Sequence, residues 1–313
     1  MENIDIDKLT PMMKIYCETK EQYKDCILFY RLGDFYEMFF DDALTASREL
    51  EITLTGKSCG LDERAPMCGI PYHAVEGYLN RLVAKGYKVA ICEQMEDPAL
   101  AKGLVKRDII RVVTPGTVIE SSMLQDDKNN YIASIYITEK KAGVCFADVS
   151  TGTAHATVLT DEKLGPEIIS ELCRYSPSEV LFNAAILDYK EVTAYIKQQL
   201  ACSVELLDEA AFAPDACMEE MRAQFGDAPE KTAGLAPESP AFTALAVLLG
   251  YLKETQKKGV ERLKTVHNYA EAQYMQLSPV TRANLELTET MRGREKKGTL
   301  LWVLDKTQTA MGK

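Results

Sequence analysis

At 313 residues, with 46% hydrophobic and 27% charged residues, the chain has the composition of an ordinary globular protein and is long enough for two or three cores. It shows neither a signal peptide nor an apolar run long enough to cross a bilayer, which argues against the exported and membrane-spanning classes. A formal net charge of −11 argues against binding duplex DNA through diffuse electrostatics, because lysine and arginine usually supply most of that affinity.

The charge is uneven along the chain. Residues 56–116 are slightly basic, whereas residues 203–238 are plainly acidic. We therefore expect a local DNA contact in the first part and a different partner in the later part. The nine cysteines form no C-x-x-C pair, and without an export signal we expect reduced thiols in a cytoplasmic protein.

The N-terminal part predicts a mixed α/β domain, which we place at residues 1–116. A helix is expected over residues 11–23, a strand over 27–30, and a second helix over 37–50, beginning at Glu37. The remaining predicted elements are a half-buried strand over 51–55, a loop over 61–68, a helix over 74–85, and strands over 88–94 and 109–113.

Phe35 and Glu37 stand where the predicted strand gives way to the predicted helix, after the turn residues Gly33 and Asp34. An aromatic ring two residues from a carboxylate at such a corner can enter a stack of nucleic-acid bases while the carboxylate bonds a base edge. The alternative is that the aromatic residues of this stretch are all core side chains and that Asp34 caps the helix. Spacing alone leaves both interpretations open.

Several short motifs follow one another along the chain in a specific order and spacing. They are Gly-Asp-Phe-Tyr-Glu at 33–37, Gly-Ile-Pro-Tyr-His-Ala at 69–74, Glu-Gln at 93–94 and Arg-Val-Val-Thr-Pro-Gly-Thr at 111–117. In order and spacing they resemble the N-terminal region of the bacterial MutS family, which recognises mismatches in DNA repair. Residues 277–287 and 309–312 resemble the start of the same family's core domain.

The resemblance implies that residues 1–116 are a mismatch-recognition domain whose ligand is mismatched double-stranded DNA. Phe35 would enter the duplex from the minor groove at the mispaired bases, and Glu37 would bond one of them. Candidate contacts to the DNA backbone are Tyr72, His73, Lys14, Lys57 and Arg107, with Lys20 as a further candidate on the first helix.

We expect no catalytic residue, metal or cofactor in this chain. Gly56-Lys57-Ser58 matches the last three positions of a phosphate-binding loop, but position 51 is glutamate where that loop needs glycine. In the resembled family, ATP and Mg belong to a C-terminal domain that we expect to be absent here. The chain is then a fragment that is not itself an enzyme.

After a polar linker at 117–130, residues 131–255 read as three strands followed by alternating helices and strands. This order predicts an RNase H-like α/β domain, and the connector domain of the resembled family is of this kind. That family's connector relays signals and binds MutL. Residues 256–313 would be the truncated start of a helical core domain. In this part, Ser278-Pro279 predicts the start of a helix that runs to about residue 289, with Leu285 able to pack inward. We expect the full-length protein to be a homodimer and this fragment to be a monomer, with no membrane contact.

The RNase H-like order also allows a metal-dependent nuclease. Asp148 lies where such an enzyme would place its first metal-binding carboxylate, and Glu167, Glu171 and Asp188 follow. The alternative is that Asp148 prepares the turn at residues 150–152.

Overall fold

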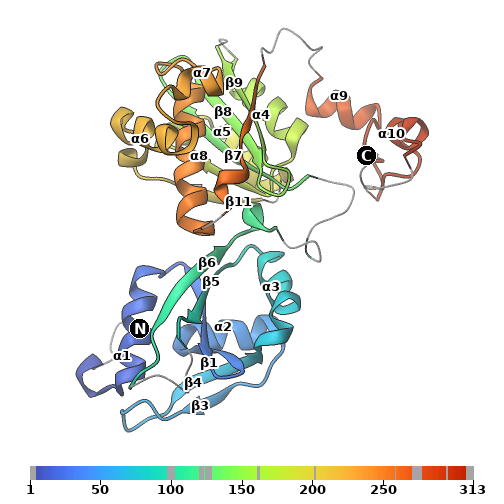
Figure 1. The fold of residues 1–313 in the computed structure, drawn as a ribbon. Helices are drawn as coiled ribbons and strands as arrows, with labels where there is room; N and C mark the ends of the chain where they lie inside the picture. The colour runs from blue at the N-terminus through green and yellow to red at the C-terminus, as the bar shows by residue number, and fades with distance from the viewer. Residues whose placement is uncertain are drawn as a thin grey trace. The chain divides into compact units, whose positions relative to one another are not determined.

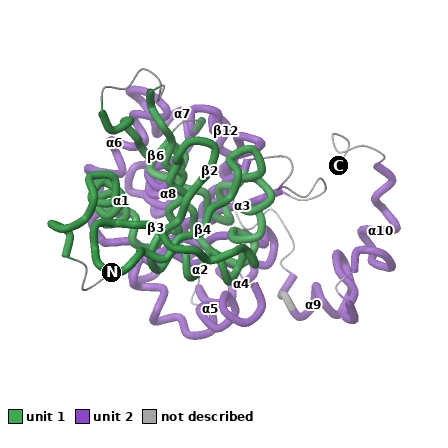
Figure 2. Tube along the Cα trace, turned by 90° about the horizontal axis from the view of Figure 1, so that it is seen from below, with its two compact units in different colours: residues 1–118, 253–259 green, residues 119–252, 260–313 purple. Residues whose placement is uncertain are grey.

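Two units make up the computed structural model, one of residues 1–118 and 253–259 and one of residues 119–252 and 260–313 (Figure 2). The structure describes residues 5–96, 103–119, 123, 129–160, 163–200, 202–257, 259–269, 277–293 and 295–307. The predicted linker falls partly outside these ranges, and the motif at 309–312 falls wholly outside them. No helix within the described ranges has the length and apolar character of a membrane span.

Unit 1 is built on a six-stranded sheet in the order β3-β4-β2-β1-β5-β6, with β1 parallel to β5 and the other pairs antiparallel. The strands are β1 (Cys26–Leu32), β2 (Phe35–Phe39), β3 (Thr55–Lys57), β4 (Ala65–Pro71), β5 (Lys88–Gln94) and β6 (Arg107–Val113). The helices are η1 (Ile6–Lys8), α1 (Pro11–Gln22), α2 (Phe40–Leu50), η2 (Tyr72–Ala74), α3 (Val75–Val83) and η3 (Pro115–Thr117).

The helix predicted to begin at Glu37 begins at Phe40 instead, so that Glu37 lies within strand β2. Aromatic residues favour strands, and β2 finds partners on both sides, in β1 and β4. The same pairing corrects two neighbouring predictions. The strand expected over 51–55 occupies Thr55–Lys57, and the loop expected over 61–68 ends in strand β4.

Other parts of unit 1 follow the sequence closely. Strand β5 has the predicted bounds, and α1 matches the predicted first helix to within a residue. The apolar face of α3 is buried at Leu79, Leu82 and Val83, as its helical spacing requires. Helix α1 lies on one side of the sheet, and α2 and α3 lie on the other (Figure 1).

Unit 2 holds a second six-stranded sheet in the order β11-β10-β7-β8-β9-β12. The strands are β7 (Tyr131–Ile137), β8 (Ala142–Asp148), β9 (Thr153–Leu159), β10 (Glu179–Phe182), β11 (Ser203–Leu206) and β12 (Thr265–Asn268). Strands β7, β8 and β9 form an antiparallel meander, and the remaining pairs are parallel. This arrangement confirms the expected RNase H-like order, with β12 added at the β9 edge.

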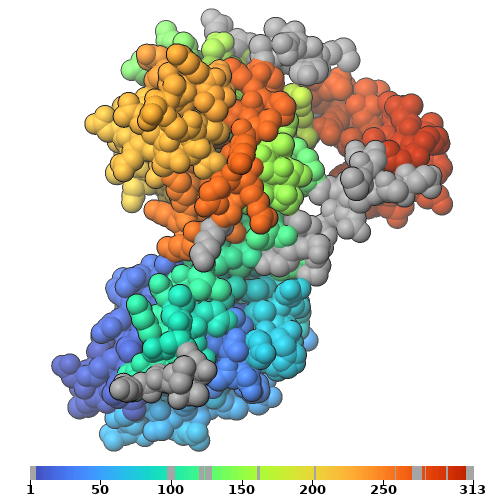
Figure 3. All heavy atoms as spheres, in the orientation of Figure 1, coloured from blue at the N-terminus to red at the C-terminus, as the bar shows by residue number. Residues whose placement is uncertain are grey.

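The helices of unit 2 cover both faces of its sheet. They are α4 (Leu164–Tyr175), η4 (Ala184–Asp188), α5 (Lys190–Tyr195), η5 (Ile196–Leu200), η6 (Glu209–Phe212), α6 (Pro214–Phe225), α7 (Pro229–Ala233), α8 (Pro240–Gln256, of which residues 240–252 belong to this unit), η7 (Val260–Arg262), α9 (Pro279–Asn284) and α10 (Leu300–Leu304). In the space-filling view, α6 and α7 form one continuous mass of atoms (Figure 3).

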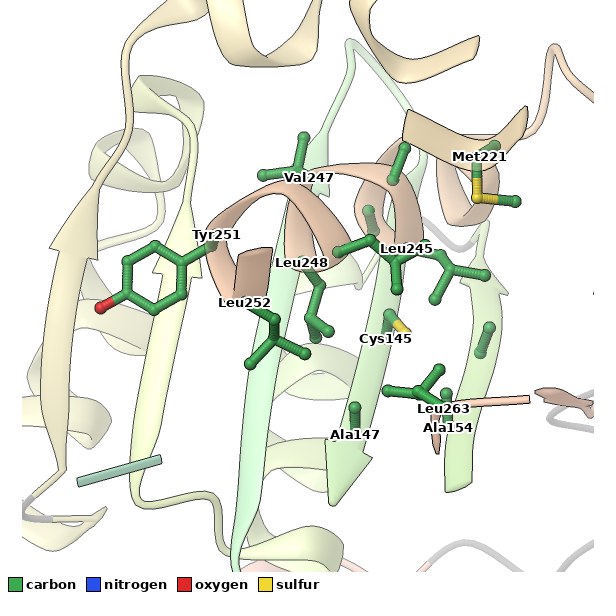
Figure 4. Packing of buried hydrophobic residues seen from close by; sticks show 14 of the residues in the cluster. Cys145, Ala147, Ala154, Met221, Leu245, Val247, Leu248, Tyr251, Leu252 and Leu263 are labelled. Atoms are coloured by element: carbon green, nitrogen blue, oxygen red, sulfur yellow. The ribbon is translucent and has the colours of Figure 1, made fainter. Parts of the chain in front are cut away.

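The core of unit 2 lies between α8 and the meander. Leu245, Leu248 and Leu252 on α8 are fully buried and point toward Cys145 and Ala147 on β8 (Figure 4). Burying a leucine side chain contributes about 1.5–3 kcal/mol, so α8 supplies much of the energy that holds this sheet together.

Helix α9 begins as predicted, because Thr281 N donates to the Ser278 hydroxyl at 3.1 Å and so caps the helix. The helix ends at Asn284, however, short of the predicted end near residue 289. Leu285, which we expected to pack inward, is 58% exposed.

Candidate nucleic-acid interface

The β1–β2 hairpin places Phe35 at the open end of a strand inside the sheet. Gly33, with φ +58°, makes the turn, and Tyr72 N donates to Asp34 O at 2.9 Å, which fixes the turn against η2. Phe35 pairs with Leu32 on β1 and Pro71 on β4, yet its side chain is 46% exposed. The ring is therefore held by backbone pairing on both sides and is not enclosed in the core.

Strand alternation puts Phe35, Glu37 and Phe39 on one face of the sheet. Helix α1 covers the Phe39 end of this face, where the ring of Tyr16 meets that of Phe39 at a centroid distance of 4.9 Å. Phe39 is 1% exposed, whereas Phe35 lies beyond the cover of α1. The uncovered part of the face thus presents an aromatic ring and a carboxylate two residues apart.

Glu37 is held by an ion pair. Its Oε2 lies 2.6 Å from Lys57 Nζ, and the two side chains are 17% and 34% exposed respectively. Lys57 comes from β3, on the far side of β4, so the pair crosses that strand. The lysine that we expected to contact the DNA backbone therefore contacts Glu37 in the free protein.

Gly69 on β4 pairs with Glu37 and keeps the space beside it open. A Cβ atom at this position would lie 3.5 Å from Glu37 Cγ and 3.8 Å from Phe35 Cδ1. The glycine of the Gly-Ile-Pro motif thus leaves room between the ring and the carboxylate.

On the opposite face, Arg31 joins the hairpin to its surroundings. Its guanidinium lies 3.8 Å from the Tyr72 ring centroid, and its Nη1 donates to Glu93 Oε1 at 3.2 Å. The Tyr36 hydroxyl donates to the same carboxylate oxygen. Burial raises the pKa of Tyr36, and the hydrogen bond to the Glu93 carboxylate raises it further. These contacts tie the hairpin to β5 and η2.

The other candidate contacts to the DNA backbone differ in how exposed they are. Tyr72 is 42% exposed and His73 is also exposed, with their rings edge to face at 5.8 Å, so both can meet an approaching ligand. Arg107 is half-buried, and its Nε donates to Arg31 O at 2.8 Å. Lys14 lies half-buried on α1.

Lys20 is not available as a phosphate contact, which corrects the sequence prediction. It is 9% exposed, and its ammonium lies 2.9 Å from Asp42 Oδ1 while donating to Cys26 O. Burial raises the pKa of Asp42, although the neighbouring ammonium opposes the shift. Lys20 therefore ties α1 to α2 and β1 inside the core.

The carboxylate of Asp148 is engaged by donors in and beside its own turn. Its Oδ1 accepts from the backbone N and hydroxyl of Ser150, at 2.9 and 2.6 Å, and its Oδ2 accepts from Asn130 N at 3.3 Å. Glu171, one of the expected partners, instead accepts from the Tyr269 hydroxyl. Within the described parts of the chain, no three His, Cys, Asp or Glu residues are grouped as a metal would need. The nuclease alternative is therefore not supported, and Asp148 organises a turn.

Sequence reasoning missed Arg31 and Gly69 as parts of this site. Both lie in or beside the motifs at 33–37 and 69–74, but neither has an unusual residue type at an unusual spacing. Only the pairing of β2 with β4 shows that Gly69 faces Glu37. We name the surface formed by Phe35, Glu37, Lys57 and Gly69 the open sheet end.

Fold and site together define the class: an α/β domain with an aromatic-carboxylate pair at the open sheet end, followed by an RNase H-like domain. Sequence models of the families described as MutS domain I, MutS domain II and MutS domain III match residues 10–122, 130–266 and 280–313. The chain belongs to the MutS family.

Curated relatives agree with this assignment. The chain is 51% identical over 304 residues to "DNA mismatch repair protein MutS" of Ruminiclostridium cellulolyticum, covering 97% of this chain and 34% of the relative. It is 50% identical over 308 residues to the protein of the same name from Acetivibrio thermocellus, covering 97% and 35%. The corresponding protein of Alkaliphilus oremlandii is 47% identical over 308 residues, with 97% and 35% covered. The chain thus spans about a third of the length of these relatives.

Proposed function

We propose that this chain recognises mispaired bases in double-stranded DNA during mismatch repair. One observation carries the proposal: Phe35 begins a strand inside the sheet and is nevertheless 46% exposed, beside a carboxylate on the same face. The names of the curated relatives, which are DNA mismatch-repair proteins, support it.

The proposed mechanism depends on the weaker base pairing at a mispaired step of the duplex. Phe35 enters from the minor groove and stacks on one base, which kinks the duplex. Unstacking a base costs a few kcal/mol, and it costs least where pairing is already broken, so much of the discrimination comes from the DNA itself. Glu37, two residues further along the same face, then bonds the edge of the displaced base.

The open sheet end supplies a rigid platform for this wedge. Pairing of β2 with β1 and β4 fixes the backbone of Phe35, and the contacts of Arg31 with Glu93 and Tyr72 hold the hairpin from behind. Tyr72 and His73, which are exposed in η2 before α3, are the proposed contacts to the DNA backbone, with Lys14 and Arg107 as further candidates.

Binding of the 313-residue chain to a duplex with one mispair and to its matched counterpart tests the proposal. We expect weak, salt-sensitive binding with a preference for the mispair. Since stacking on an aromatic side chain contributes about 1–3 kcal/mol per base, Phe35→Ala should lower that preference by about tenfold or more. Leu44→Ala, which removes another large exposed side chain on α2, is the matched control and should leave the preference unchanged. An unchanged preference in Phe35→Ala would contradict the proposal.

We propose further that residues 131–255 transmit the signal of mismatch binding and bind MutL. We also propose that the chain works without a cofactor of its own, and that it is a monomer without enzymatic activity. The full-length protein would be a homodimer that binds ATP and Mg through its C-terminal domain. Retention of MutL by the immobilised chain tests the partner, and loss of retention after deletion of residues 131–255 should follow.

A further inference from the structure

The ion pair between Lys57 and Glu37 leaves the two carboxylate oxygens in different states. Oε2 lies 2.6 Å from the ammonium. Among the described residues, none donates a hydrogen bond to Oε1. One oxygen is thus occupied within the protein, and the other remains for an outside donor.

We propose that Lys57 is a positioning residue for mismatch discrimination, which holds Glu37 by Oε2 so that Oε1 faces the displaced base. This inference rests on the proposed function of Phe35 and Glu37. A glutamate side chain has several rotatable bonds, and an ion pair with a lysine from another strand restricts them before DNA arrives.

Three features of the open sheet end favour this role over a simple phosphate contact. The lysine stem crosses β4 to reach Glu37, and its ammonium also lies 5.5 Å from the Phe39 ring centroid, so it is directed inward along the sheet. Gly69 carries no side chain that would fill the space beside the carboxylate. The ammonium also offsets the negative charge of Glu37 at a surface that a polyanion approaches.

A double-mutant cycle on the full 313-residue chain tests the proposal. Lys57→Met should lower the ratio of mispaired to matched affinity by about two- to fivefold, as expected for loss of a partly exposed ion pair. Lys57→Arg, which can still pair with Glu37, should restore the ratio. In a Glu37→Gln background, Lys57→Met should leave the ratio unchanged, because the lysine acts through the carboxylate.

A phosphate contact would give a different pattern. Lys57→Met would then weaken both duplexes alike and reduce the salt dependence, with the ratio unchanged in both backgrounds, and the proposal would be overturned. This result differs from failure of the proposed function, in which the wild-type chain and Phe35→Ala would show the same lack of preference.

Zero-length coupling with a carbodiimide provides a second, independent readout. The reagent joins a carboxylate to a contacting amine, so mass spectrometry should find Lys57 linked to Glu37 in the free chain and also with saturating mispaired duplex. Loss of the link on addition of mispaired duplex would show that Lys57 leaves Glu37, which contradicts a positioning role. The matched control is Lys85, whose Nζ lies 2.9 Å from Glu49 Oε2 in a part of the chain outside the open sheet end. Lys85 should remain linked to Glu49 throughout.

Discussion

The two units each contain a six-stranded sheet, but the two sheets differ in how completely helices cover their central strands. In unit 2, strand β8 is buried along its whole length, because α8 covers one face of the meander and α4 covers the other. In unit 1, β2 also lies between two neighbouring strands, but its first side chain is 46% exposed. A covered strand holds a core together, whereas a strand that runs out of cover can present its side chains to a ligand.

Two glycines make this comparison testable, with the largest effect expected in unit 2. A Cβ atom at Gly143 on β8 would lie 2.0 Å from the backbone carbon of Pro240, whereas one at Gly69 would meet nothing closer than 3.4 Å. Gly143→Ala must force the backbone of α8 away from the sheet, so we expect a loss of about 3 kcal/mol or more in the free energy of unfolding. Gly69→Ala should cost less than about 1 kcal/mol.

Urea unfolding followed by circular dichroism measures the difference between the two variants. Hydrogen exchange in β8 and β2 assigns each loss to its unit. Equal losses for the two substitutions would mean that the open sheet end is packed as tightly as the covered core. Because Gly69→Ala also narrows the space between Phe35 and Glu37, it should reduce the preference for mispaired DNA while the fold survives.

A smaller effect is expected at the β12 edge of the unit 2 sheet. There, the ring of His155 on β9 stacks on that of His267 on β12, with a centroid distance of 5.1 Å. Burial lowers the pKa of His155, and His267 and Arg174 lower it further, while Tyr131 and Tyr175 also contact its ring. The folded state therefore binds a proton less readily than the unfolded state. Stability should be complete above the ordinary pKa of 6.5 and should fall as the pH drops below it, through the lowered value.

The unfolding free energy of wild type and of His155→Gln, measured from about pH 8 to about pH 5, checks this sign. The wild type should lose more stability than the variant on acidification. A steeper loss in His155→Gln would contradict the assignment, since the remaining histidines are the same in both proteins.

Much of the fold could be predicted from local patterns. The bounds of β5 follow from an apolar run between turn residues, and the meander follows from short strands separated by tight turns. Strand β2 could not be predicted, because its five residues mix aromatic side chains with a glutamate, and its partner β4 contains two prolines and a glycine. Pairing between the two strands decides the structure, and pairing is not a local property.

The candidate site shows the same division. Phe35 and Glu37 could be named from a short motif, and their exposure on a common face agrees with the interpretation that the motif suggested. The partner of Glu37 could not be named, because Lys57 reaches it only through the register of β3 on β4 and of β4 on β2. Lys20 was wrongly predicted to contact DNA because its burial against Asp42 depends on the packing of α1 over the sheet, which local sequence does not reveal.

The central claim is that the exposed ring of residue 35 stacks on a base at a mispaired step. Photocrosslinking tests it directly, with p-benzoylphenylalanine in place of Phe35 and, as a control, in place of Leu44, which is 47% exposed on α2. We predict crosslinks from position 35 concentrated at the mispaired bases, with few in the matched duplex and few from position 44. Crosslinks from position 35 that spread evenly along both duplexes, or that match those from position 44, would contradict the account.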